Sequence, residues 1–99
     1  MGWATKHIED LLNGKTVKFR PQGNSMSGKV ESGQLCTVEP DTSSLAVDDI
    51  VLCKVNGNQY LHLIKEIKDG QYLIGNNKGG TNGWIASKCI YGKLTKVED

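Results

Sequence analysis

The sequence lacks an excess of charge of either sign, because its 12 basic side chains face 11 acidic ones and leave a formal net charge of +1. A near-neutral surface does not attract polyanions, so we expect no nucleic-acid partner. No apolar run approaches the roughly 20 residues that cross a bilayer, and residues 1–12 lack the apolar core of a secretory signal. We therefore expect a soluble, cytoplasmic chain without membrane insertion.

Local pairs of metal ligands are also missing. The cysteines Cys36, Cys53 and Cys89 form an odd set at wide spacings, which is typical of free thiols in a reducing cytosol. His7 and His62 could complete a zinc site, but no C-x-x-C or H-x-x-x-H pair brings two ligands together. We expect no metal and no cofactor, and interpret the cysteines as small buried apolar residues.

The chain of 99 residues fits one domain, residues 1–99, and its twelve glycines with two prolines favour β structure. A short amphipathic helix is expected over about 5–13, with Thr5 as cap and Asn13-Gly14 as stop. The β core spans about 15–97. Its expected strands are residues 15–20, 35–39, 50–55, 59–67, 71–74, 84–85 and 90–97. Asn56-Gly57 and Lys68-Asp69-Gly70 predict the tight turns of two successive hairpins. Strands joined in this way predict a mainly β fold, a small coiled and partly closed barrel.

One polar loop carries a candidate nucleophile. The segment from Gly23 to Gly28 contains Ser25 on a flexible backbone that can bring its hydroxyl to a substrate carbonyl. Serine and glycine are also ordinary loop residues, so a simple turn is the alternative interpretation.

The surrounding motifs extend this hypothesis. The pattern Gly23-x-Ser25-Met26, followed by Val30-x-x-Gly33, resembles the nucleophile box of the signal peptidase and LexA-type (S24/S26) serine peptidases. Further boxes follow in the family's order: Asp49-Ile50-Val51, Tyr60-Leu61-His62-Leu63-Ile64, Leu73-Ile74-Gly75-Asn76-Asn77 and Ile90-Tyr91-Gly92-Lys93-Leu94. The resemblance covers about residues 17–97. It implies the coiled β core of that family and a peptidase that acts on protein or peptide substrates.

The general base differs from the family's bacterial members, in which it is a lysine. His62 stands at that position here, and Lys65, three residues on, is expected on the opposite strand face. The eukaryotic and archaeal signal peptidase branch uses histidine, so the resemblance implies a dyad of Ser25 and His62 without a membrane anchor. An imidazole with a pKa near 6.5 is already largely neutral in the cytosol. The alternative is a structural histidine on a strand.

A histidine base needs an acceptor for its second nitrogen. The family's histidine branch supplies an aspartate from the segment after the G-D-N box, but residues 76–83 hold no carboxylate. Asn82 falls near that place, and its amide oxygen could orient the ring. The resemblance assigns the oxyanion contact to the backbone N–H of Ser25 and packs Met26 beneath it.

Several other positions depart from the family or match nothing in it. Gly28 replaces a motif proline, and Gln34 replaces a motif aspartate. We interpret Trp3 and Trp84 as core or lid residues, and His7 as a solvated surface residue.

Three functions are therefore compatible with the sequence. The first is a serine peptidase with a Ser25–His62 dyad; lacking an Ala-Gly or Cys-Gly pair and a helix-turn-helix segment, it would cleave another protein rather than itself. Its activity is expected to rise with pH through about 6–7. The second is a binding module that keeps the fold without activity. The third, an unrelated β-barrel adaptor, predicts that Ser25 and His62 lie far apart.

Overall fold

A computed structural model describes residues 2–99. One helix, α1 (Thr5–Leu12), precedes the strands. The strands are β1 (Val17–Phe19), β2 (Leu35–Glu39), β3 (Ile50–Val55), β4 (Asn58–Lys68), β5 (Gln71–Gly75), β6 (Thr81–Ala86) and β7 (Ile90–Glu98), with the 3₁₀ turn η1 (Ser87–Cys89) before the last.

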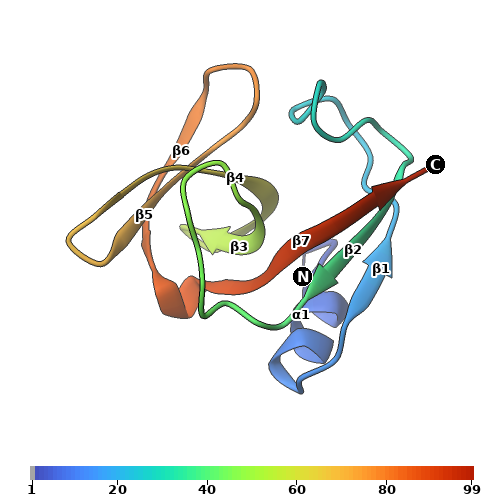
Figure 1. The fold of residues 1–99 in the computed structure, drawn as a ribbon, viewed down its shortest axis with the longest axis horizontal. Coiled ribbons are helices and arrows are strands. Elements are labelled where there is room, and N and C mark those ends of the chain that lie inside the picture. Colours follow the sequence, from blue (N-terminus) through green and yellow to red (C-terminus); the bar gives the residue numbers. More distant parts are fainter. Residues whose placement is uncertain (1) are drawn as a thin grey trace.

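The strands form one antiparallel sheet in the order β1-β2-β7-β3-β4-β5-β6. The last strand, β7, inserts between β2 and β3, so the end of the chain joins two parts of the sheet that follow each other in sequence (Figure 1). The sheet coils without closing, since the outer strands β1 and β6 are not paired with each other in the described residues. The expected mainly β, partly closed fold with an N-terminal helix is confirmed.

Two apolar clusters lie on the coiled sheet. The first holds the buried face of α1, with Ile8 and Leu11, together with Met26 and Val30 from the β1–β2 connection. The second joins the middle of β3 to β5 and β6 through residues such as Val51, Ile74 and Ile85. β4 contributes to both clusters, because Leu61 and Leu63 belong to the first and Ile64 to the second. β4 is thereby held from both sides, which fixes any side chain that it presents.

The tight turns follow the local sequence. Asn56 and Gly57 have φ of 50° and 82°, and Asp69 and Gly70 have φ of 52° and 74°. Two successive positive φ values suit the right-handed twist of a two-residue hairpin, and glycine and asparagine tolerate them. Both expected hairpins, β3–β4 and β4–β5, are present.

Some local predictions are wrong. Thr5 does not cap α1: Ala4 is the N-cap residue, and the Thr5 hydroxyl donates to the Gly2 carbonyl at 3.1 Å. β1 is half as long as expected, with three residues. β6 begins at Thr81 rather than at Trp84, because glycine-rich sequence reads as a loop although β5 supplies a pairing edge there. The stop at Asn13-Gly14 is confirmed, with Gly14 at φ 80°.

Candidate active site

Ser25 lies in the connection between β1 and β2, and backbone hydrogen bonds within this connection hold its shape. The Gly33 N–H donates to the Pro21 carbonyl at 2.8 Å, and the Val30 N–H donates to the Met26 carbonyl at 2.8 Å. Met26 and Val30 are buried in the first apolar cluster, at 5% and 3% exposure. The expected inward packing of Met26 is confirmed. Ser25, its neighbour, is therefore held at the surface of an anchored turn.

Gly28 explains why this loop departs from the family motif. Its φ is 96°, whereas a proline ring fixes φ near about −65°. A Cβ at this position would also lie 3.0 Å from the Asn77 side-chain nitrogen. The positive φ excludes proline and favours glycine, and a Cβ would also crowd the Asn77 side chain, so the missing proline has a physical cause.

Asn77 fastens the loop of Ser25 to the β5–β6 connection. Its backbone N–H donates to the Ser25 carbonyl at 2.9 Å, and its side-chain Nδ2 donates to the Ser27 carbonyl at 2.7 Å. The two connections rise on the same side of the molecule, the blue-green one beside the orange one (Figure 1). The sequence marked Asn77 only as part of a turn-like box, because nothing local shows which loop it will touch.

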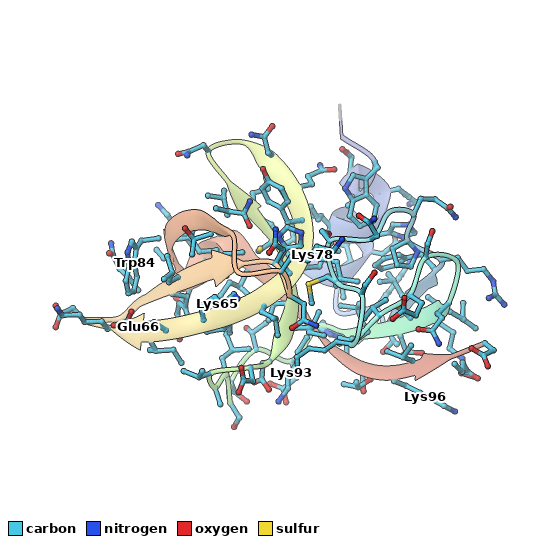
Figure 2. The ribbon with its side chains drawn as sticks, turned by 90° about the horizontal axis from the view of Figure 1, so that it is seen from above. Lys65, Glu66, Lys78, Trp84, Lys93 and Lys96 are labelled. Atoms are coloured by element: carbon cyan, nitrogen blue, oxygen red, sulfur yellow. The ribbon has the colours of Figure 1, made fainter. Side chains whose placement is uncertain are left out.

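His62 stands on β4 opposite Val51 of β3, and only 7% of it is exposed. Its Nε2 lies 3.1 Å from the Ser25 Oγ, within hydrogen-bond distance. The 37 positions between these residues are thus bridged by the fold. Lys65 does not line the pocket beside them; its alkyl chain lies against Gly75, and Figure 2 labels it on β4.

Asn82 completes the arrangement from β6. Its Oδ1 lies 2.7 Å from the His62 Nδ1. A carbonyl oxygen only accepts, so Nδ1 carries the proton and donates, which leaves the Nε2 lone pair for the Ser25 hydroxyl. The prediction placed Asn82 in a loop, but it is the second residue of β6. The strand fixes it more firmly than a loop would.

The surroundings of His62 favour the neutral ring. Burial lowers the pKa of His62 below its ordinary value, and the hydrogen bond with Asn82 opposes this shift without cancelling it. The Tyr60 ring stacks on the imidazole at 4.8 Å between centroids. A neutral imidazole with a free Nε2 lone pair is the protonation state that a general base requires.

A pocket of about 300 Å³ opens beside the Ser25–His62 pair. Its walls come from the N-terminal segment, the loop of Ser25 and β4. The lining residues are Trp3, Pro21, Gln22, Gly23, Ser25, Met26, Val30, Glu31, Ser32, Gln59, Tyr60, Leu61 and His62. Sequence reasoning did not assign Glu31, Gln59 or Tyr60 to the site, and no pattern in the chain signals that they meet there.

Neither tryptophan is a core residue. Trp3 is 52% exposed, lines the pocket and donates from its indole Nε1 to the Gln59 carbonyl at 3.2 Å, which agrees with the lid alternative. Trp84 is 43% exposed and projects from β6, toward the end of the molecule away from Lys96 (Figure 2). The interpretation of Trp84 as core or lid is wrong, because much of the residue is exposed and it does not line the pocket beside Ser25.

His7 and the cysteines lie outside this site. His7 is half-buried and stacks on Phe19 at 4.6 Å, so the prediction of a solvated surface residue is wrong. Cys36 and Cys53 are buried, Cys89 is half-buried, and all three are free thiols. Burial raises the pKa of Cys53 to about 12, which keeps it protonated. Residues 2–99 contain no group of three or more side chains suited to a metal ion.

Comparison with known families adds a decisive observation. A family model described as Peptidase S24-like matches residues 5–90, a span that includes Ser25, His62 and Asn82. The chain belongs to the peptidase S24-like family. A search of curated proteins finds no match. Family membership and the 3.1 Å separation of Ser25 and His62 exclude the unrelated adaptor. Among the described residues, no helix of this S24-like chain is long and apolar enough to cross a membrane.

Proposed function

We propose that this S24-like protein is an active serine peptidase in which Ser25 is the nucleophile and His62 the general base. The observation that carries the proposal is the 3.1 Å contact between Ser25 Oγ and His62 Nε2 at the edge of a pocket. A serine hydroxyl needs a neighbouring base to become a nucleophile. The proposal groups the chain with the histidine-base variants of the superfamily.

In the acylation step, Ser25 Oγ forms a bond to the substrate carbonyl carbon while its proton moves to His62 Nε2. The imidazolium then gives that proton to the amide nitrogen, the C–N bond breaks and the amine leaves. Water then attacks the acyl ester and passes a proton to Nε2; the imidazolium returns that proton to Ser25 Oγ as the ester C–O bond breaks, and the carboxylic acid product leaves. Asn82 keeps the ring in the orientation and tautomer that both steps need.

The negative oxygen formed in each step requires a donor. The Ser25 backbone N–H is the proposed donor, and within residues 2–99 it makes no hydrogen bond to another residue. Asn77 supports this role, because it holds the Ser25 peptide carbonyl at 2.9 Å and so fixes the turn. An N–H group that is already fixed in position costs little reorganisation energy when negative charge develops on the substrate oxygen.

The proposed substrates are proteins or peptides, as expected of a peptidase family. The three free thiols support a reducing compartment such as the cytoplasm. A near-neutral net charge of +1 gives no reason to expect nucleic acid as partner.

The experiment is covalent labelling with a fluorophosphonate, followed by intact-mass and peptide-mass measurement. We expect one adduct on Ser25, none on Ser25→Ala, and labelling slowed by at least about a hundredfold in His62→Ala. A wild-type protein that stays unmodified under conditions that label a standard serine peptidase would refute the proposal.

The second candidate is a catalytically silent binding module. It is favoured by one observation: the acceptor on His62 Nδ1 is the neutral amide of Asn82 rather than a carboxylate. An amide orients the ring but stabilises the imidazolium less than a negative charge does. In that case the pocket would bind a peptide without an adduct forming on Ser25.

A further inference from the structure

The pocket beside Ser25 has an uneven chemistry. Glu31 is the single charged side chain among its lining residues, all of which lie in the described part of the chain. About half of the other lining residues are apolar or aromatic, with Trp3, Met26 and Val30 among them. We propose that this pocket binds the lysine or arginine side chain of the residue whose carbonyl Ser25 attacks. This inference rests on the proposed peptidase function.

The apolar walls suit the stem of such a side chain. Lysine and arginine bury three or four methylene groups while their charged ends seek a polar partner. A pocket of about 300 Å³ accepts a long side chain and is much larger than an alanine needs. Met26 and Val30 are buried and anchored, so this part of the wall is preformed.

Glu31 supplies the partner for the charged end. Its Oε2 accepts a hydrogen bond from the Gly28 N–H at 2.7 Å, which ties the carboxylate to the loop of the nucleophile. None of the ion pairs within residues 2–99 includes Glu31. The second carboxylate oxygen is therefore available to a cation, and a charge-assisted hydrogen bond is stronger than a neutral one.

Two aromatic residues add to the preference. The indole of Trp3 is held by its bond to the Gln59 carbonyl while half of the residue stays exposed. Tyr60 lines the same pocket. Aromatic faces attract ammonium and guanidinium groups, and they also pack against apolar stems. An acidic side chain would instead meet the Glu31 carboxylate and be repelled.

The test compares three diphenyl phosphonates that differ only in the side chain next to phosphorus: 4-aminobutyl, 3-guanidinopropyl and n-butyl. The first two imitate lysine and arginine, and the third is the uncharged counterpart of lysine. Labelling forms a bond from Ser25 Oγ to phosphorus, releases phenoxide and passes the hydroxyl proton to His62. We expect both basic probes to label Ser25 about tenfold faster than the butyl probe, with less preference in high salt.

Glu31→Gln is the decisive variant, because the amide oxygen can still accept from Gly28 while the charge is lost. The rate ratio of basic to butyl probes is expected to fall to near one. Glu39→Gln, which removes an exposed charge on β2 outside this pocket, is the matched control and should keep the ratio. Equal rates for all probes in the wild type, or an unchanged ratio in Glu31→Gln, would overturn the basic specificity while leaving the peptidase function intact.

A binding measurement separates this inference from the proposed function. The Trp3 indole N–H resonance is followed while acetyl-lysine methylamide or acetyl-norleucine methylamide is added. If no probe labels Ser25 but the lysine compound binds more tightly than the norleucine compound, catalysis is refuted and the pocket specificity stands. If neither labelling nor preferential binding of the lysine compound occurs, both proposals fail.

Discussion

At the scale of single residues, the chemistry depends on how His62 is protonated. The ring is nearly buried, so the charged form loses hydration, and Asn82 offers an oxygen but no negative charge in return. Burial therefore lowers the pKa of His62 and favours the neutral ring, and the hydrogen bond with Asn82 offsets only part of this shift. A neutral amide also stabilises the imidazolium that forms during acylation less than a carboxylate would. His62 is therefore available as a base, but the charged ring that results from the proton transfer is less well stabilised.

The first prediction concerns the pH dependence of Ser25 labelling. Only neutral His62 can accept the serine proton, so the labelling rate should rise with pH and then reach a plateau. Because burial lowers the pKa of His62, the midpoint of this rise should lie below that of a free imidazole, near 6.5. The sequence alone suggested a rise through about 6–7, and the structure moves the expected midpoint lower. Fluorophosphonate labelling rates between pH 4.5 and 9 check this. A midpoint near 9 would instead indicate a lysine base.

The second prediction concerns Asn82→Asp. A carboxylate at the same place would stabilise the imidazolium, so the labelling rate at its plateau should increase about tenfold. The pKa of His62 should rise, which moves the midpoint of the pH profile upward. Asn82→Leu, which removes the acceptor but keeps the volume, should lower the rate. Asn82→Asp with a slower rate and an unmoved midpoint would show that Asn82 does not orient the ring.

At the scale of elements, the sequence predicts the hairpins well because local turn chemistry specifies them. Asn56-Gly57 and Asp69-Gly70 need no distant partner to adopt positive φ. β6 was predicted too short because its first residues become a strand only where β5 offers hydrogen bonds. The hydrogen bonds from Asn77 to the loop of Ser25 could not be predicted for the same reason. They join the β1–β2 and β5–β6 connections, whose proximity depends on the whole sheet.

The third prediction concerns Gly28, where the family motif has proline. Restoring the motif with Gly28→Pro should reduce Ser25 labelling rather than improve it, because φ of 96° excludes proline. Gly28→Ala should destabilise the protein by about 1–2 kcal/mol and slow labelling, since its Cβ also crowds Asn77. Urea unfolding and labelling rates measure the two effects.

Gly14→Ala is the control for Gly28→Ala. Gly14 has a similar φ of 80°, ends α1 and has no atom within 4 Å of its would-be Cβ. It should lose comparable stability while Ser25 is labelled at the wild-type rate. Equal labelling losses in the two variants would mean that general destabilisation, rather than the nucleophile loop, controls the rate.

At the scale of the whole molecule, the sheet brings together groups from three separate segments. Ser25 precedes β2, His62 stands on β4 and Asn82 on β6, and the insertion of β7 between β2 and β3 holds these parts in one body. The candidate residues Ser25, His62 and Asn82 could be selected from motif order. The pocket walls at Trp3, Glu31 and Tyr60 could not, because three-dimensional proximity alone relates them.

The last prediction links His62 to the stability of the fold. Its pKa is lower in the folded protein than in the unfolded chain, so the unfolded state binds more protons at acidic pH. The free energy of unfolding therefore keeps its full His62 contribution above the unfolded pKa, near 6.5, and loses it as pH falls through 6.5 toward the folded value. Below the folded value the loss is complete.

The measurement is urea unfolding of the wild type and of His62→Gln between pH 5 and 7.5. Glutamine does not titrate, so the wild type should lose more stability than the variant as the pH is lowered across this window. A difference between wild type and His62→Gln that stays constant with pH would mean that the fold does not hold this imidazole neutral, and the same neutral ring is what the proposed base requires.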